Sequence, residues 1–228
     1  MVLTGDNAAH GAVLRLRLGE EIVACCPNGI DHYSRVLSVS KGEICAEVTR
    51  SMPNAAEPPV LITLYQALPK GDKMSEIVEK CVELGVSAIV PVITARCVAR
   101  PPDSSNKVAR WRRIAESAAK QSGRGLIPHV SNHIALSDAV APAKTHDAAL
   151  VCLETEVKLG IKDFMQSLPP IKSIGLFVGP EGGFDGNEAA MFAEQAIRAV
   201  TLGRRILRTE TAAAAAIANI LYELESVL

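Results

Sequence analysis

Hydrophobic and polar residues alternate in short stretches over the first fifty residues, and turn-forming residues separate these stretches. The alternation is clearest in residues 13–18, and it returns in residues 33–39 and 44–48. Asn28-Gly29 is typical of a hairpin, because both central positions of a type I′ turn need positive φ. The pattern predicts a small antiparallel β-barrel or sandwich over residues 1–57. A proline-rich linker over residues 51–59 ends it, because proline breaks a ladder of strands.

After the linker the hydrophobic period changes, which predicts alternating strands and helices. Four apolar runs lack the polar alternation of a sheet that is wet on one face, so we expect a buried parallel sheet; they are residues 60–66, 86–93, 148–153 and 174–178. Helical spacing is found in residues 74–84 up to Gly85, and a second helix is expected from Ser104 or Ser105. Asp185 and Glu188 predict a capped helix to about residue 197. With a strand at 199–202 and a final helix from Thr211, this order predicts an α/β domain over residues 58–228.

Composition limits the classes of protein to which the chain can belong. Its 228 residues, 48% of them hydrophobic, can bury a substantial core. No apolar run approaches the roughly 20 residues of a membrane span, and residues 1–10 lack a secretory signal. We therefore expect a cytoplasmic protein. The six cysteines form no CxxC pair and predict reduced thiols. His129 and His133 are four apart, but no HExxH arrangement accompanies them, so no metal site is predicted.

Charge is unevenly distributed although the formal net charge is only -1. Residues 107–124 contain Lys107, Arg110, Arg112, Arg113, Lys120 and Arg124 against the single acid Glu116. A solvated helix face usually mixes signs, so this excess favours phosphate binding without establishing it.

Two loops follow predicted buried strands and precede predicted helices, the place where open α/β sheets bind ligands. The first is GPEGGF at residues 179–184, and the second is LGRRILRTET at residues 202–211. Glycine lets a backbone approach a ligand closely, although a plain tight turn is the alternative for the first loop. The chain has no GxxxxGK[ST] and no GxGxxG after a strand. Glu181 would repel a pyrophosphate, so a cofactor with a cationic sulfonium and amine suits the loop better; the pattern alone does not identify it.

At these loops the sequence resembles the RsmE family of SPOUT-class methyltransferases, which methylate N3 of a uridine in small-subunit (16S) ribosomal RNA. Residues 73–85 and 110–124 match the family's motifs in the same order, and His10 with residues 13–17 resembles its RNA-binding part. The resemblance implies a PUA-like β-barrel before a SPOUT domain with a trefoil knot. It also implies a homodimer, a small-ribosomal-subunit RNA partner and S-adenosylmethionine as cofactor. The start of the chain departs from the family, because an expected first barrel strand is missing or shortened.

The resemblance also assigns binding residues to three loops and to two basic regions. RNA contacts are implied for His10, Arg15, Arg17, Arg110, Arg113 and Arg124. Arg15 and Arg17 would share one face of a strand, which suits RNA but is equally common on a solvated barrel. The implied cofactor-binding residues are Leu153, Glu154, Thr155, Phe177, Val178, Gly179, Pro180, Glu181, Gly182, Gly183, Leu202, Gly203, Ile206, Leu207, Arg208, Thr209 and Thr211.

Methylation of uridine N3 requires removal of its proton or stabilisation of the developing anion. We predict that Arg208 supplies the cation, the alternative being an ion pair with Glu210. Glu210 itself either accepts the proton or orders the loop. Glu181 is interpreted as a loop or dimer-interface residue, with substrate contact as the alternative, and Trp111 as helix core and not as a base-stacking platform.

Two other functions stay open from the sequence. One is a methyltransferase of the same fold that acts on transfer RNA or on another ribosomal position. The other is a non-catalytic RNA-binding or assembly factor, which the intact glycine and threonine loops disfavour.

Overall fold

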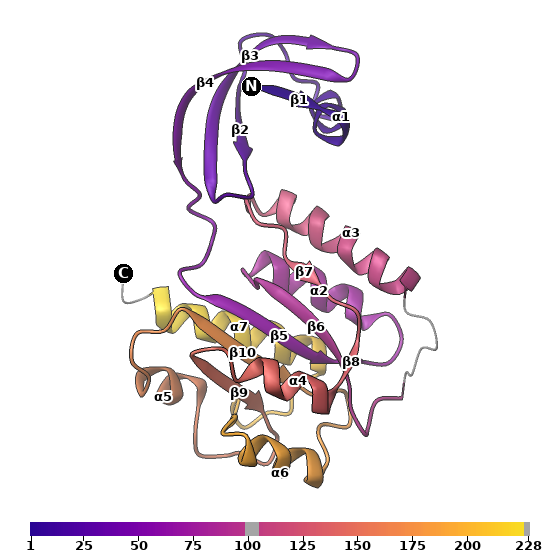
Figure 1. Cartoon of the computed structure of the whole chain (residues 1–228), viewed down its shortest axis with the longest axis vertical. Coiled ribbons are helices and arrows are strands. Elements are labelled where there is room, and N and C mark those ends of the chain that lie inside the picture. The colour runs from indigo at the N-terminus through magenta and orange to yellow at the C-terminus, as the bar shows by residue number, and fades with distance from the viewer. Residues whose placement is uncertain (99–104, 226–228) are drawn as a thin grey trace. The chain divides into compact units, whose positions relative to one another are not determined.

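The computed structural model describes residues 1–98 and 105–225, and the chain divides into two compact units (Figure 1). The first unit consists of Met1–Glu57 together with Gly123–Leu126, and the second of Pro58–Ser122 and Ile127–Leu228. Within the described ranges no helix is long and apolar enough to cross a membrane.

The first unit is built on a four-stranded antiparallel sheet, as the alternating pattern predicts. The strands are β1 (Val2–Thr4), β2 (Glu21–Cys25), β3 (Ile30–Ser40) and β4 (Glu43–Pro53). Their order in the sheet is β1-β4-β3-β2, which leaves β1 and β2 at its edges. Gly29, with φ of 76°, lies in the turn of the predicted β2–β3 hairpin.

The strand predicted over residues 13–18 is wrong. Of these residues only Val13 lies in a helix, α1 (Gly5–Val13), and a turn follows in which Arg15 has φ of 55°. The helix packs closely on the sheet: a Cβ added to the buried Gly11 would lie 2.3 Å from the Ile44 side chain on β4. Arg15 and Arg17 are both exposed, but they do not share a strand face.

The linker predicted over residues 51–59 begins later than expected, because β4 continues through Met52 to Pro53. The far half of β4 pairs with β3 alone, since β1 pairs with β4 only at residues 43–45. An edge of this kind tolerates a proline, which has no N–H to donate.

A short distant segment completes the first unit and changes the interpretation of Arg124. The Arg124 side chain is 1% exposed, and its guanidinium forms two hydrogen bonds to Glu57, at 2.8 Å and 3.4 Å. The Leu126 N–H also donates to Glu57 at 2.9 Å, and Asn54 donates to the Gly123 carbonyl at 3.1 Å. The expected phosphate contact of Arg124 therefore finds no support, because its charge is used inside the unit.

The second unit contains the predicted parallel sheet. Its strand order is β11-β9-β10-β5-β6-β7, with β8 also paired to β6. The strands are β5 (Leu61–Ala67), β6 (Ala88–Ile93), β7 (His129–Val130), β8 (Ile134–Ala135), β9 (Ala148–Cys152), β10 (Ser173–Val178) and β11 (Arg198–Val200). The two shortest, β7 and β8, escape prediction because two residues carry no period.

Helices cover both faces of this sheet, so its strands are apolar throughout. One core cluster includes residues of α2 (Lys73–Glu83), α3 (Ser105–Gln121), α5 (Ile161–Gln166) and α7 (Thr209–Glu225), and the other includes residues of α4 (Leu136–Ala143) and α6 (Gly186–Glu194). Trp111 is 5% exposed in the first cluster, which confirms its interpretation as core. The predicted cap of α6 is also confirmed: Asp185 accepts from the Glu188 N–H, and Glu188 accepts from the Asp185 N–H, each at 2.8 Å.

Candidate cofactor site at the carboxyl ends of the strands

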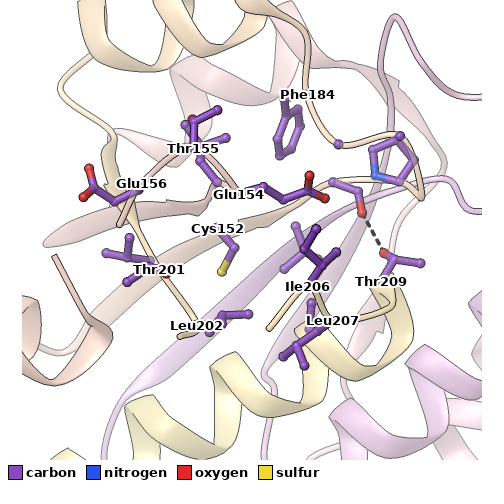
Figure 2. A pocket seen from close by; sticks show the side chains of 18 of the residues that line it. Cys152, Glu154, Thr155, Glu156, Phe184, Thr201, Leu202, Ile206, Leu207 and Thr209 are labelled. Atoms are coloured by element: carbon purple, nitrogen blue, oxygen red, sulfur yellow. Dashed lines mark hydrogen bonds between the residues drawn. The ribbon is translucent and has the colours of Figure 1, made fainter. Parts of the chain in front are cut away.

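A pocket of about 550 Å³ lies where β9, β10 and β11 end (Figure 2). Parallel strands bring the loops that follow them to one edge of the sheet, so segments distant in sequence meet there. The lining comes mainly from residues 152–157, 178–186 and 200–209. All three predicted loops therefore contribute to one pocket, and every predicted cofactor residue lines it except Phe177 and Thr211.

Phe177 and Thr211 lie outside the lining for reasons of side-chain direction. Phe177 is fully buried in the core cluster that includes residues of α4 and α6, stacked on Tyr65 at 4.5 Å between ring centroids and with its ring centroid 5.0 Å from that of Phe192. Thr211 is exposed on the first turn of α7, which begins at Thr209, two residues earlier than expected.

Several lining residues are absent from the predicted cofactor-binding residues, although Phe184, Arg204 and Arg205 belong to the two predicted loops; Arg96 and Phe184 are the most informative of them. The Arg96 guanidinium donates to the Gly182 carbonyl at 2.6 Å and holds the first loop from outside. Phe184 packs edge-on against Phe192, with ring centroids 4.9 Å apart. Position after a strand end was the available signal for many of these residues, including Arg96, which comes three residues after the end of β6. The others are Cys152, Glu156, Val157, Asp185, Gly186, Ala189, Val200, Thr201, Arg204, Arg205 and Ala212.

The first loop is a tight turn whose glycines are required by its geometry. Gly183 has φ of 66° and donates its N–H to the Pro180 carbonyl at 2.9 Å. A Cβ on Gly179 would lie 3.2 Å from the Cα of Gly183, closer than most real contacts. The backbone thus stays open toward the pocket, as ligand binding to main-chain groups requires.

The chemistry of the lining is apolar at its base and charged around it. Cys152, Leu202 and Leu207 supply apolar surface, while Glu154 and Glu156 bring carboxylates. Burial raises the pKa of the Cys152 thiol to about 12, so the thiol stays neutral and acts as an apolar group. An apolar base with nearby carboxylates suits a nucleoside that carries cationic groups, and the donor set fits S-adenosylmethionine.

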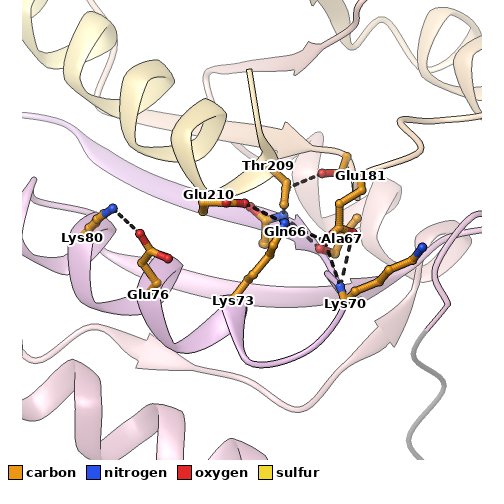
Figure 3. A network of polar contacts seen from close by, with 10 residues as sticks. Gln66, Ala67, Lys70, Lys73, Glu76, Lys80, Glu181, Thr209 and Glu210 are labelled. Atoms are coloured by element: carbon orange, nitrogen blue, oxygen red, sulfur yellow. Dashed lines mark hydrogen bonds and ion pairs between the residues drawn. The ribbon is translucent and has the colours of Figure 1, made fainter. Parts of the chain in front are cut away.

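A polar network supports the two main loops from behind (Figure 3). The Thr209 hydroxyl donates to the Gly179 carbonyl at 2.6 Å and accepts from the Gln66 amide at 2.9 Å. The Lys73 ammonium lies 3.0 Å from Glu181 and 3.3 Å from Glu210. The hydrogen bond to Glu181 raises the pKa of Lys73. Burial alone would raise the pKa of Glu181, but its hydrogen bonds, including that from Lys73, lower it below the ordinary value.

The surroundings of Arg208 and Glu210 bear on the two interpretations of Arg208. Glu210 is 8% exposed, pairs with Lys73 and does not line the pocket. Among the ion pairs of the described residues none joins Arg208 to Glu210. Arg208 is exposed at the pocket, so its guanidinium is available to a ligand.

The basic residues of α3 are partly engaged within the second unit. Arg110 forms two hydrogen bonds to Asp72, at 2.7 Å and 2.9 Å, and Lys120 pairs with Glu116 at 2.7 Å. Arg113 is exposed on this helix, and His10 is exposed on α1 of the first unit. In the part of the chain that the structure describes, no group of three or more metal-ligating side chains is found.

Comparison with known proteins gives consistent matches along the chain. Residues 56–221 match the model of a family described as an RNA methyltransferase domain. The chain is 33% identical over 230 residues to the ribosomal RNA small subunit methyltransferase E of Bacillus subtilis, covering 98% of this chain and 90% of that protein. The protein of the same name from Synechocystis is 35% identical over 217 residues, covering 94% and 70% respectively.

A solved structure shows the same likeness in three dimensions. It is the ribosomal RNA small subunit methyltransferase E of Neisseria gonorrhoeae bound to S-adenosyl methionine. The sequence identity is 36% and the TM-score 0.84, and the match covers 96% of this chain and 90% of that one.

Proposed function

Since this chain belongs to the RNA methyltransferase family that includes the ribosomal RNA small subunit methyltransferases E, we propose that it methylates N3 of a uridine in 16S ribosomal RNA with S-adenosylmethionine. The observation that carries the proposal is the pocket itself. Three loops that the family resemblance assigns to cofactor binding converge on one cavity of about 550 Å³. A cavity of this size is in the range that holds a small ligand.

The lining residues suggest how the cofactor is held. Cys152, Leu202 and Leu207 offer apolar contacts for an adenosine, and Glu154 offers a carboxylate for a cationic amine or sulfonium. The backbone of the 179–183 loop offers main-chain groups to the ligand. The bound cofactor supplies an electrophilic methyl group on sulfonium sulfur, and the protein supplies orientation and exclusion of water.

We assign the positive charge at the reacting base to Arg208. N3 of uridine carries a proton, and its loss leaves negative charge on the base near O2 or O4, which a cation stabilises. Arg208 lines the pocket and is exposed there. Glu210 is bound to Lys73 behind the loop, so we assign it loop ordering in preference to proton transfer.

RNA contacts and assembly complete the proposal. The candidate RNA contacts are the exposed residues Arg113, His10, Arg15 and Arg17, together with Arg110, which is paired with Asp72. Arg124 is left out because it is buried. We also propose that the first unit acts as a PUA-like barrel and that the protein works in the cytoplasm as a homodimer. Light scattering, which measures the molar mass in solution, tests the homodimer.

We also propose a trefoil knot near the C-terminus. Its support is that β11 lies at the sheet edge while α7 packs back on β10 and β5, so residues 201–208 must return across the sheet. A crystal structure that traces this segment tests the knot, and an unthreaded path would overturn it.

The test of function combines calorimetry with nucleoside analysis. Titration of the protein with S-adenosylmethionine is expected to give saturable heat. Incubation with small subunits that lack the modification is expected to yield N3-methyluridine by mass spectrometry. A Thr211→Ala variant, altered at an exposed position outside the pocket, should behave like the wild type. Absence of heat would indicate a binding factor, and methylation of transfer RNA or of a different nucleoside would indicate a related enzyme; either result defeats the proposal.

A further inference from the structure

Two residues behind the pocket, Gln66 and Lys73, support its main loops without lining it (Figure 3). Lys73 pairs with Glu181 and Glu210, and Gln66 binds Thr209, whose hydroxyl donates to Gly179 of the first loop. Gln66 is fully buried near the carboxyl end of β5, and Lys73 begins α2. Neither side chain was singled out by the loop motifs, because each acts through residues of the loops.

The orientation of the Gln66 amide follows from its partners. The hydroxyl hydrogen of Thr209 is directed to the Gly179 carbonyl at 2.6 Å, so Thr209 can only accept from Gln66. The second partner is the Ala67 carbonyl at 2.9 Å, which also needs a donor. The NH₂ group must therefore face both, because a side-chain amide has two donors on its nitrogen alone.

This orientation leaves the Gln66 carbonyl oxygen buried, with no hydrogen-bond partner among the residues that the structure describes. An unpaired buried acceptor costs stability, and proteins rarely keep one without a reason. Here the amide nitrogen ties Thr209, at the end of the second loop, to a chain of bonds that ends at Gly179 in the first loop. The free energy lost at the unpaired oxygen is consistent with a requirement to hold Thr209, and through its hydroxyl the Gly179 carbonyl, in one position.

Lys73 connects the same two loops by charge. Its ammonium lies between Glu181 of the first loop and Glu210, directly after the second. Without the lysine these two carboxylates would face each other and repel. The Lys70 N–H also donates to Glu181, at 3.2 Å to each oxygen, which holds the first loop against the start of α2.

We propose that Gln66 and Lys73 are positioning residues that hold the 179–183 loop and the 202–209 loop at one separation, so that the cofactor pocket is formed before the ligand arrives. The inference rests on the function proposed above. A preformed site binds more tightly because less ordering accompanies binding. Loss of either residue therefore weakens binding of S-adenosylmethionine although neither residue touches it.

The first test compares cofactor affinities by calorimetry. Gln66→Met keeps the side-chain length and removes both donors, and Lys73→Met removes the charge. Each variant is expected to raise Kd for S-adenosylmethionine about tenfold, the effect of losing one or two hydrogen bonds. Lys73→Arg should restore most of the affinity. Lys80→Met is the matched control, because Lys80 pairs with Glu76 on the same helix and reaches neither loop. It should stay within about twofold of the wild type.

The second test uses pH to restore the missing donor. Gln66→Glu places a carboxylate where two donors are needed, so its affinity should be low at about pH 8. Protonation of this buried carboxyl at about pH 5.5 returns one donor, and the ratio of its Kd to the wild-type Kd at the same pH should fall severalfold. A residue that only fills space would show a constant ratio. In turnover assays KM for the cofactor should rise more than kcat falls.

The outcomes separate the inference from the function on which it rests. Folded Gln66→Met and Lys73→Met proteins, judged by circular dichroism, that bind with wild-type affinity would overturn the positioning role alone. A wild-type protein that gives no saturable heat would overturn the proposed function. If Gln66→Met does not fold, the comparison of Lys73→Met with Lys80→Met decides, because the Lys73 side chain is 30% exposed and its loss leaves the core intact.

Discussion

Replacing Arg124 by methionine distinguishes a structural role of this residue from a role in RNA binding. Its side chain is 1% exposed and bonded to Glu57, whereas its place in a basic segment of the sequence favours a phosphate contact. Methionine keeps much of the apolar stem, so the variant mainly removes the charge and its hydrogen bonds. The perturbation therefore tests the ion pair that joins Gly123–Leu126 to the rest of the first unit.

The expected cost follows from what the change leaves behind. Removing one partner of a buried ion pair costs about 3–5 kcal/mol, because the other charge stays buried and unpaired. Glu57 is 21% exposed and keeps the Leu126 N–H at 2.9 Å, so water and this bond offset part of the loss. We expect the lower end, about 3 kcal/mol, which corresponds to a roughly 100-fold larger fraction of opened first unit.

Hydrogen exchange followed by mass spectrometry measures this opening segment by segment. Amides of β3 and β4 should exchange roughly 100-fold faster in Arg124→Met, while those of β5 and β10 should be unchanged. Arg113→Met is the matched control, since Arg113 is exposed and should affect only RNA affinity. Unchanged exchange in the first unit together with lost RNA affinity would refute the structural interpretation.

Three further predictions concern the pocket. Arg208→Ala should lower methyl transfer about 100-fold with Kd for S-adenosylmethionine within about threefold, measured separately by turnover and calorimetry; near wild-type turnover would remove Arg208 from the chemistry. Gly183→Ala should weaken cofactor binding about tenfold, because its φ of 66° strains any side chain. Gly42→Ala, strained alike at φ of 83° in the first unit, should bind normally; equal losses would contradict a local effect. The lowered pKa of Glu181 means that its stabilisation is present above its ordinary value of 4.5 and is lost as pH falls through the folded value. The melting temperature of the wild type should therefore fall more steeply below about pH 4.5 than that of Glu181→Gln; parallel curves would count against this.

Local signals in the sequence were sufficient for most of the second unit. Buried parallel strands are apolar throughout, and helices have their own period, so elements such as β10 and α2 could be placed from the pattern. The cap of α6 needs only Asp185 and Glu188, which are three residues apart. The glycine turn at residues 179–183 is equally local, since it follows from backbone freedom at those positions.

The first unit shows where a local pattern gives the wrong answer. Residues 13–18 alternate like a strand, yet α1 ends at Val13 and a turn follows it, and Gly11 of this helix packs against Ile44 of a distant strand. The inclusion of Gly123–Leu126 in this unit was equally invisible. An arginine in a basic segment looks the same in the sequence whether its side chain is exposed or buried. Only the contact of Arg124 with Glu57 in the folded chain shows that this side chain is buried.

The sequence by itself determined the family, the longer strands and helices of the second unit and the identity of the loops that form the pocket, because these depend on neighbours along the chain. Only the tertiary structure decided which side chains face the pocket: Phe177 is buried against Tyr65 and Phe192, and Arg96 reaches Gly182. It also revealed that Gln66 holds Thr209 across 143 residues of chain, and that Lys73 pairs with Glu181 and Glu210 across 108 and 137 residues. Such contacts depend on how strands are ordered in space, and no period or spacing along the chain records that order.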